Sequence, residues 1–413
     1  MKVLNINTSD ILGGASRAVY RLHQGLKLID VNSQMFVQSK SSDDFTVSGN
    51  KTKLEKAFGK VKPTLDTFPL NFYKEREKTV FSTQWLPSNI HTRINQLNPD
   101  VVNLHWICGG FIPIETLAKI KVPLVWTLHD MWAFTGGCHY AGDCEGYLNN
   151  CGNCPQLNSN QSWDLSRWIW QRKSKSWNSV KLTIVTPSQW LADCAKKSSL
   201  FKNYRVEVIP YGLDINIYKP IDKQFARNLL NLPQDKKLIL FGAMSGTSNQ
   251  RKGFQFLSPA LEKLALKNHT NDFELVVFGA SQPAQDPNLP FKTNYLGRLN
   301  DDVSIALLYS AVDVFVAPSV EDNLPNTVME SLACGTPTVA FKIGGMPDMI
   351  EHQVNGYLAQ PFEIGDLTQG ISWILKENQN YHKLSENARK TVEEKFTLKL
   401  QARRYLELYR GSN

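Results

Sequence analysis

The stretch from Glu321 to Phe341 combines residue types that suit a ligand carrying phosphate and hydroxyl groups. It reads EDNLPNTVMESLACGTPTVAF. Asn326 is a favourable helix N-cap, and residues 327–334 are expected to form about two helical turns that end at Gly335. The N-terminus of such a helix offers unpaired N–H groups and a partial positive charge, and both suit a phosphate.

Two carboxylates flank the start of this expected helix. Glu330 lies one turn inside it, where its carboxylate can reach the hydroxyls of a ribose attached to the phosphate. Asp322 lies in the preceding loop, where a strong acceptor can bind sugar hydroxyls. A capped helix with exposed acids would have the same spacing, so this alternative stays open.

Four cysteines lie in a Gly- and Asn-rich segment, residues 136–157, which reads GGCHYAGDCEGYLNNCGNCPQL. They are Cys138, Cys144, Cys151 and Cys154. Four thiols ending in a Cys-x-x-Cys pair suit a tetrahedral zinc site that would fold a segment without a core. The gap between the first two is wider than in the usual zinc knuckle, and unligated thiols, an iron–sulfur cluster or a redox pair remain alternatives.

A second unusual segment, residues 162–179, combines aromatic and basic side chains. It carries Trp163, Trp168, Trp170 and Trp177 together with Arg167, Arg172, Lys173 and Lys175. A basic helix with tryptophans can lie in a membrane interface. The favoured interpretation is a domain helix that buries its aromatic side chains and leaves its charges in water.

Short β-branched runs alternate with helical or loop segments along the chain. They are KVLNINTS, DVVNLHWI, PLVWTLHD, KLTIVTPS, VEVIPYG, KKLILFGA, FELVVFGA, VDVFVAPS and PTVAF. Such an alternation is typical of parallel, doubly wound sheets, and the strands are too many for one small sheet. We therefore expect an α/β protein with two Rossmann-like domains.

The hinge between these domains is expected in a polar segment, residues 221–237, because the strand-helix pattern restarts after it. We expect an N-terminal domain over residues 1–215, a C-terminal domain over 216–390, and a helix over 391–413 that can pack back on the first domain. A chain of 413 residues exceeds the length at which one core usually stops growing.

The polar clusters that could bind ligands all follow expected strands. GGASR (13–17) follows the first strand, His129 and Asp130 end PLVWTLHD, and RKG (251–253) follows KKLILFGA. Ligands of open α/β sheets bind beyond the carboxyl ends of the strands. We therefore expect two sheets that face each other across one cleft lined by these loops.

Composition and charge narrow the function classes. The chain is 42% hydrophobic and 20% charged, and no apolar run approaches the roughly 18 residues of a membrane helix. Seven cysteines without a secretion signal indicate reduced thiols in the cytosol. A net charge of +8 and a pI near 9.0 favour an anionic partner, but the basic residues are scattered, which ranks nucleic acid last.

The sequence resembles the retaining glycosyltransferases of family 4, which have the GT-B fold of two Rossmann-like domains. The resemblance rests on GGASRAVYRL, TLHD, VTPSQWL, VIPYGLD, QRKGF, YLGRLND, the stretch from Glu321 to Phe341, and IGGMPDMI. Asp322 and Glu330 occupy the two acidic positions of the family signature, although the family usually has Glu at the first. Ala243 replaces an arginine that typically follows the glycine of the first strand in the second domain.

The resemblance implies three groups of site residues. The catalytic residues would be His129, Lys252 and Asp322; the donor-binding residues Gly14, Arg251, Lys252, Arg298, Leu299, Asp322, Asn323, Leu324, Asn326, Thr327 and Glu330; and the acceptor-binding residues Gly13, Gly14, Arg17 and His129. Arg251 and Lys252 would hold the donor diphosphate. Either Glu321 or Asp322 would contact the sugar. His129 would contact the donor sugar or the acceptor, and a strand-end histidine bonded to backbone is its structural alternative.

The implied function is retaining transfer of a sugar from a UDP- or GDP-sugar to a hydroxyl acceptor in polysaccharide or glycoconjugate biosynthesis. The acceptor would be a sugar, a lipid-linked compound or another hydroxyl compound, and no catalytic metal is expected. The expected location is cytoplasmic, with peripheral contact at the inner face of the membrane as an option. A sugar-nucleotide epimerase of similar fold and a non-catalytic sugar-nucleotide-binding scaffold remain alternatives.

Overall fold

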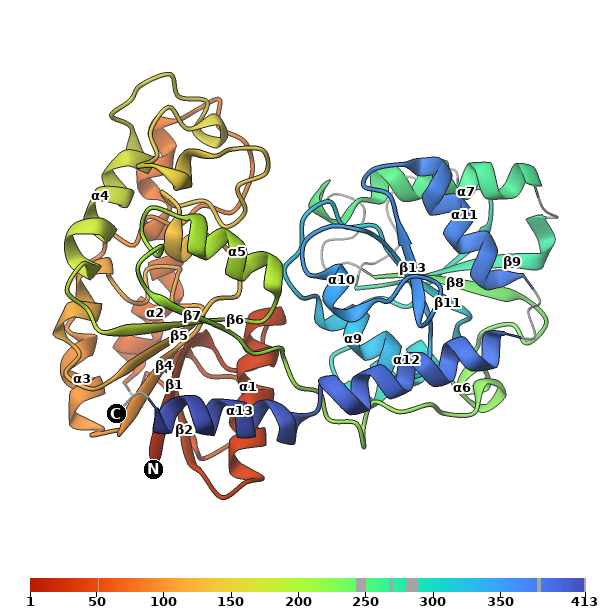
Figure 1. Cartoon of the computed structure of the whole chain (residues 1–413), viewed down its shortest axis with the longest axis horizontal. Coiled ribbons are helices and arrows are strands. Elements are labelled where there is room, and N and C mark those ends of the chain that lie inside the picture. The colour runs from red at the N-terminus through yellow and green to blue at the C-terminus, as the bar shows by residue number, and fades with distance from the viewer. Residues whose placement is uncertain (51, 243–249, 268–269, 280–288, 377–379, 412–413) are drawn as a thin grey trace. The chain divides into compact units, whose positions relative to one another are not determined.

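Two compact units make up the computed structural model, which describes residues 1–50, 52–242, 250–267, 270–279, 289–376 and 380–411 (Figure 1). Unit 1 comprises Met1–Gly212 and Leu398–Asn413, and unit 2 comprises Leu213–Thr397. Ala243 lies outside the described residues. Within the described ranges, no helix is long and apolar enough to cross a membrane.

Unit 1 is built on a parallel sheet with the strand order β3-β2-β1-β4-β5-β6-β7. The strands are β1 (Lys2–Ser9), β2 (Asn32–Ser39), β3 (Val47–Ser48), β4 (Val101–Leu104), β5 (Leu124–Thr127), β6 (Leu182–Thr186) and β7 (Arg205–Val208). The order reverses between β1 and β4. In open sheets of this kind, ligands bind beyond the carboxyl ends of the strands at this reversal.

Helices surround this sheet, and the last helix of the chain is among them. They are α1 (Gly14–Lys27), α2 (Lys53–Asp66), α3 (Ile90–Gln96), α4 (Leu165–Trp177), α5 (Gln189–Lys197) and α13 (Leu398–Arg410), with the short turns η1 (Phe68–Phe72), η2 (Ile114–Lys119), η3 (Trp132–Phe134), η4 (Gly146–Leu148) and η5 (Pro155–Leu157). Two buried tyrosines of α13 bond polar groups of the sheet: the Tyr409 hydroxyl accepts from Asn103 at 2.8 Å, and the Tyr405 hydroxyl lies 2.9 Å from that of Thr127. These contacts tie the C-terminal helix to unit 1.

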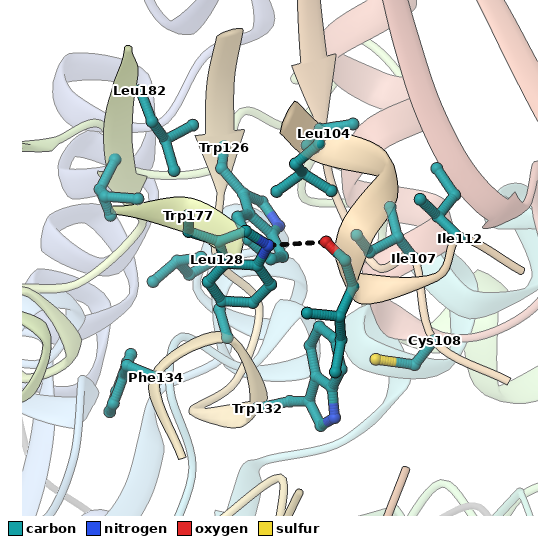
Figure 2. Packing of buried hydrophobic residues seen from close by; sticks show 14 of the residues in the cluster. Leu104, Ile107, Cys108, Ile112, Trp126, Leu128, Trp132, Phe134, Trp177 and Leu182 are labelled. Carbon is teal, nitrogen blue, oxygen red and sulfur yellow. Dashed lines mark hydrogen bonds between the residues drawn. The ribbon is translucent and has the colours of Figure 1, made fainter. Parts of the chain in front are cut away.

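The main core of unit 1 is rich in aromatic side chains (Figure 2). Trp126 of β5, Trp132 of η3 and Trp177 of α4 pack together, and the Trp177 indole donates to the Ile114 carbonyl at 2.8 Å. Trp177 is fully buried and Trp170 partly buried, whereas Trp163 and Trp168 are exposed. The tryptophan-bearing segment therefore contains a packed domain helix, as the favoured interpretation expected. That interpretation is wrong for Lys173, which is fully buried and donates to the Thr135 carbonyl at 3.0 Å, and for the two exposed tryptophans.

Unit 2 contains a parallel sheet with the strand order β10-β9-β8-β11-β12-β13. The strands are β8 (Lys237–Gly242), β9 (Phe273–Phe278), β10 (Lys292–Tyr295), β11 (Val314–Ala317), β12 (Thr338–Phe341) and β13 (Gly356–Ala359). The helices are α6 (Lys223–Leu229), α7 (Phe254–Lys267), α8 (Asp302–Ala311), α9 (Asn326–Ala333), α10 (Met346–Met349), α11 (Ile364–Leu375) and α12 (Tyr381–Lys395). Figure 1 shows α7 and α11 on one face of the sheet and α9 and α12 on the other.

The fold class expected from the sequence is confirmed. Both sheets follow the strand order of a doubly wound Rossmann sheet, with the reversal between β1 and β4 in unit 1 and between β8 and β11 in unit 2. The physical basis is that the inner strands are buried on both faces, which requires the continuous apolar runs seen in the sequence.

Candidate functional site

An ion-pair cluster lies at the reversal point of the unit 2 sheet. One carboxylate oxygen of Asp322 (Oδ2) accepts a hydrogen bond from Lys252 Nζ at 2.7 Å. The same oxygen lies 3.3 Å from Arg251 Nη1 and 3.3 Å from the Ser319 hydroxyl. Lys252 and Arg251 belong to a 3-10 turn, η7 (Gln250–Lys252), which precedes α7, and Asp322 follows β11. The two parts come together because β8 and β11 are neighbours in the sheet.

The cluster keeps a negative charge inside and leaves its positive groups partly in solvent. Asp322 is buried, with 7% of its surface exposed, whereas the side chains of Lys252 and Arg251 are 23% and 31% exposed. Burial alone would raise the pKa of the Asp322 carboxyl, but Lys252 and Arg251 lower this pKa below its ordinary value. The carboxylate is therefore ionised at neutral pH and orients two cations that remain accessible to an anion.

Two glycines allow the loops of this cluster to approach closely. Gly253 has φ +76°, and a Cβ atom there would lie 1.7 Å from the Pro318 carbonyl oxygen. Gly344, with φ +51°, would place a Cβ atom 1.9 Å from the carbonyl oxygen of Asp322. Any side chain at either position would push the loops after β8, β11 and β12 apart, so the geometry around Asp322 depends on glycine.

The helix that follows Asp322 differs slightly from its expected form. α9 begins at Asn326 with Pro325 as its N-cap, and no side chain caps it. Asn326 is therefore not the N-cap, which corrects that expectation; the proline before it fixes an extended backbone that the helix can follow. Gly335, with φ +75°, ends the helix region as expected. Glu330 lies in α9 but is buried, with 3% of its surface exposed, so the exposed-acid alternative is wrong for this residue.

The remaining donor-side residues lie at different places in unit 2. Asn323 and Leu324 are buried beside Asp322, and Asn326 and Thr327 are partly exposed at the start of α9. Arg298 and Leu299 follow β10, the outermost strand, which is separated from β8 by β9. Glu321 is partly exposed, and its backbone carbonyl accepts from Arg251 at 2.9 Å.

In unit 1, His129 belongs to a chain of hydrogen bonds at the carboxyl ends of the central strands. Its Nδ1 lies 2.7 Å from the Tyr211 hydroxyl, and its Nε2 lies 3.0 Å from Nδ1 of His105. The other ring nitrogen of His105 lies 3.3 Å from the side-chain oxygen of Asn5. The amide nitrogen of Asn5 donates to the Ser33 hydroxyl, which assigns the oxygen as the acceptor for His105.

This chain fixes the tautomers of both histidines when they are neutral. His105 donates through Nε2 to Asn5, so its Nδ1 accepts from His129 Nε2–H, and His129 Nδ1 accepts from Tyr211. Burial lowers the pKa of His129 to about 4, although neighbouring Asp130 opposes the shift. Burial, followed by the nearby His129, lowers the pKa of His105 well below its ordinary value. Both rings are therefore neutral at pH 7.

The carboxylate of Asp130, the residue after His129, bonds two aromatic side chains. Its carboxylate accepts from His139 Nδ1 at 2.7 Å and from the Trp106 indole at 2.9 Å. A small cavity of about 10 Å³ is lined by His105, His129 and Asp130 among others, which is room for about one water molecule and far too little for a sugar. A sugar that contacts His129 would therefore lie outside this cavity.

The glycine loop of unit 1 lies at the same end of the sheet. Gly13 has φ +94° and is the N-cap of α1, whose first turn carries Gly14 and Arg17. No side chain caps α1, and its first turn contains no acid. Gly13, Gly14 and Arg17 follow β1, which is one of the two strands at the reversal, and His129 follows β5, the neighbour of β4. All four residues therefore lie beyond the carboxyl ends of strands, where the sequence placed them.

Sequence reasoning missed His105 and Tyr211. His105 follows directly after β4, and this position was a usable signal because polar residues after strands of a doubly wound sheet face the ligand end. Tyr211 follows β7, which is separated by β6 from β5, the strand that precedes His129. Nothing in the local sequence indicates the bond between Tyr211 and His129.

The expected zinc site is not supported. Among the residues that the structure describes, no three His, Cys, Asp or Glu side chains form a group that could hold a metal ion. Burial raises the pKa of Cys151 to about 12 and that of Cys154 to about 11, which keeps these thiols protonated. The segment is instead held by direct bonds, such as Cys154 N–H to the Asp164 carboxylate at 2.8 Å and Gly152 N–H to the Ser166 hydroxyl at 2.9 Å.

Two family models match the chain and together span most of it. The model described as Glycosyltransferase Family 4 matches residues 12–217, and the model described as Glycosyl transferases group 1 matches residues 222–391.

Curated relatives of the chain are glycosyltransferases. An uncharacterised glycosyltransferase of Methanocaldococcus jannaschii is 28% identical over 208 residues, which are 49% of this chain and 51% of the relative. The D-inositol 3-phosphate glycosyltransferase of Arthrobacter sp. is 25% identical over 68% of this chain and 66% of its own length. That of Mycolicibacterium smegmatis is 26% identical over 67% of this chain and 59% of its own length. The chain thus spans between about half and two thirds of the length of these relatives.

Solved glycosyltransferase structures share the fold. Sucrose-phosphate synthase from Thermosynechococcus elongatus has a TM-score of 0.69 and 18% identity, over 100% of this chain and 99% of that one. HepE of Anabaena, in complex with UDP-glucose, has a TM-score of 0.65 and 17% identity over the full length of both chains. At these identities the comparison establishes the fold, which is the GT-B fold of these glycosyltransferases.

Proposed function

The chain belongs to the group 1 glycosyltransferases of family 4, and from this premise we propose that it moves a sugar from a nucleotide-sugar to an acceptor hydroxyl with retention of configuration. The bond between the sugar C1 and the donor phosphate oxygen breaks, and a bond between C1 and the acceptor oxygen forms on the same face. The proton of the acceptor hydroxyl passes to the leaving phosphate.

The observation that carries this proposal is the Asp322 cluster. Lys252 and Arg251 together carry two positive charges, and Asp322 neutralises one of them, so the cluster offers a net positive charge to a diphosphate. Both cations are partly exposed at the reversal of the unit 2 sheet, where Rossmann-like sheets bind nucleotides. Negative charge grows on the phosphate as the C1–O bond breaks, so fixed cations stabilise the transition state more than the bound donor.

The rest of the donor would extend from this point along unit 2. In the proposal, Glu330 accepts hydrogen bonds from the ribose hydroxyls, and the segment Asn323–Thr327 contacts the sugar and phosphates. Arg298 and Leu299, after β10, contact the nucleobase. Because the Asp322 carboxylate is already bonded to two cations, we propose that Asp322 acts mainly by positioning Lys252 and Arg251.

Unit 1 would supply the acceptor side. Gly13, Gly14 and Arg17 would bind polar groups of the acceptor. His129 is neutral at pH 7, and both of its ring nitrogens bond protein groups, Tyr211 and His105. In the proposal it therefore contacts the acceptor or the donor sugar through the carbon edge of its ring and not through charge. The proposed acceptor class is a sugar or lipid-linked hydroxyl compound of polysaccharide or glycoconjugate biosynthesis.

The relatives suggest where to begin the search for substrates. The Anabaena neighbour was solved with UDP-glucose, and several relatives are named for D-inositol 3-phosphate. We therefore propose a UDP-hexose as the first donor to test and a GDP-hexose as the second.

A thermal-shift panel of UDP- and GDP-sugars tests this function, because a ligand that binds only the folded protein raises its Tm. We expect one nucleotide class to raise the Tm, and proton NMR of the transfer product to show the anomeric configuration of the donor. An inverted product would refute the retaining mechanism. Conversion of the donor sugar without an acceptor would favour an epimerase, and binding without any turnover would favour a non-catalytic binding protein.

A further inference from the structure

Helix α2 of unit 1 carries an exposed apolar stripe. Leu54, Phe58 and Val61 are spaced by four and three residues, which places them on one face of the helix. They are 83%, 52% and 49% exposed. An amphipathic helix normally buries its apolar face on the protein core, so this helix presents the face that usually packs inwards to the surroundings.

The opposite side of α2 attaches the helix to unit 1 through small and polar groups. The carbonyl oxygen of Gly59 accepts from Gln38 at 3.2 Å. The buried carboxylate of Asp66 accepts from the backbone N–H and the hydroxyl of Thr83, both at 3.2 Å. In α2, Gly59 and Asp66 are the buried residues. The helix is thus firmly placed by its polar side, and its apolar stripe is not required for this attachment.

The chain continues from α2 into further exposed aromatic residues. Phe68 and Phe72 of η1 pack edge to face, with ring centroids 6.2 Å apart, and are 53% and 79% exposed. We call Leu54, Phe58, Val61, Phe68 and Phe72 the α2–η1 apolar surface. Large exposed apolar side chains that come from one short segment indicate an interaction site.

Lysines accompany this surface. Lys53, Lys56 and Lys60 are exposed on α2, and Lys62 lies 5.5 Å from the centre of the Phe58 ring. The helix has one exposed acid, Glu55, and its carboxylate accepts from the Thr52 N–H in the capping box at the start of the helix. The exposed charge along the helix is therefore positive.

We propose that the α2–η1 apolar surface binds the surface of a membrane that contains anionic lipids. Phenylalanine and leucine side chains favour the boundary between lipid headgroups and acyl chains, and lysines beside them bind anionic headgroups. The charge selects this occupant over a second copy of the chain, because two lysine-rich surfaces repel each other when they meet. The proposal stands independently of the sugar-transfer function.

Sedimentation with vesicles tests the proposal. The full chain, without nucleotide-sugar, is mixed with vesicles of phosphatidylcholine alone or of phosphatidylcholine with phosphatidylglycerol. We expect the protein to bind only the anionic vesicles, and added salt to weaken the binding because it screens the lysines. Equal binding to both vesicle types, or no binding to either, overturns the proposal.

Variants locate the contact. The triple variant Leu54→Ser, Phe58→Ser, Val61→Ser should lose at least tenfold in vesicle affinity, and so should Lys53→Glu, Lys56→Glu, Lys60→Glu. Two matched controls should bind like the wild type: Phe225→Ser with Leu229→Ser on α6, which are 55% and 58% exposed, and Trp163→Ser with Trp168→Ser, which are 62% and 42% exposed.

The outcomes separate the competing occupants. If the tryptophan variant alone loses binding, the membrane contact lies at α4 and the proposal is wrong. If sedimentation velocity shows a wild-type dimer that the triple serine variant abolishes, without vesicle binding, the surface belongs to a second copy. Circular dichroism checks that each variant is folded, and the single variant Phe58→Ser replaces the triple one if that protein is unstable.

Discussion

Lys252 and Asp322 are 70 positions apart in the sequence, yet their side chains meet in an ion pair of 2.7 Å. The pair forms because the strands that precede the two loops, β8 and β11, lie next to each other at the reversal of the unit 2 sheet. One member is buried and the other is partly exposed, so the buried carboxylate positions a cation that can still meet a ligand.

Removing the cation should impair the chemical step. We expect Lys252→Ala to lower kcat by roughly a hundredfold, because the lost charge acts mainly as the phosphate leaves. The variant also leaves Asp322 with one cation fewer, so the double variant Lys252→Ala, Asp322→Asn is the decisive comparison. If Lys252 serves only to pair with Asp322, the double variant regains activity. If Lys252 binds the phosphate, the double variant stays as inactive as Lys252→Ala. Lys263→Ala, an exposed lysine of α7, is the control and should keep full activity.

Glu330→Gln should weaken nucleotide binding. A neutral amide accepts weaker hydrogen bonds from ribose hydroxyls than a carboxylate does, so the Kd for the nucleoside diphosphate should rise by about tenfold or more. Isothermal titration measures this Kd directly. Because Glu330 is buried, circular dichroism must first establish that the variant is folded. An unchanged Kd in a folded variant would place the ribose elsewhere.

Tyr211→Phe should disturb His129 without touching the donor site. The change removes the hydroxyl that lies 2.7 Å from His129 Nδ1, which costs about 1 kcal/mol of unfolding free energy and releases the ring. We expect kcat/KM to fall several-fold while the Kd for nucleotide stays the same. Tyr204→Phe is the matched control, because it also removes one hydrogen bond in unit 1, the bond from the Tyr204 hydroxyl to the Trp177 carbonyl. This control should leave kcat/KM unchanged.

The free energy of unfolding should fall as the pH is lowered from about 6.5 to 4. Burial lowers the pKa of His23 and that of His129 to about 4, and the pKa of His105 still more. The unfolded chain protonates these groups near pH 6.5 and so binds more protons than the native state in this range. Each histidine contributes a slope of at most about 1.4 kcal/mol per pH unit.

Tryptophan fluorescence during urea unfolding can measure this slope, because Trp373 is in unit 2 and the other nine tryptophans are in unit 1. The variant His129→Asn should reduce the slope, whereas His382→Gln, at an exposed position of unit 2, should not change it. A slope that is zero or of opposite sign would contradict the assignment of neutral histidines.

Gly253→Ala should destabilise unit 2. Its Cβ atom would lie 1.7 Å from the Pro318 carbonyl oxygen at φ +76°, and we expect a loss of roughly 3 kcal/mol or more of unfolding free energy. Gly365→Ala in α11 is the control, since no atom lies within 4 Å of the added group. Differential scanning calorimetry compares the two, and equal Tm values would show that the two loops can separate at little cost.

The sequence by itself determined the fold class and the position of most strands. Runs such as VFVA in β11 and LVWT in β5 are continuously apolar because both faces of the strand are covered, and a local pattern of this kind needs no tertiary information. The strands β2, β3, β10 and β13 were not predicted, and β3 has only two residues. β2 and β10 carry polar residues, and β13 (GYLA) begins with glycine and contains no β-branched residue, so it lacks the pattern seen in the other strands.

The tertiary structure alone decided which side chains meet. Lys252 and Asp322 were each expected near phosphate or sugar, but their ion pair depends on the order of the strands. The bond between His105 and His129 joins loops after two neighbouring strands, and the four cysteines have a spacing that suits zinc without an arrangement that could hold it. Spacing along the chain fixes which residues are available, whereas distances between side chains depend on packing between segments that are far apart in sequence.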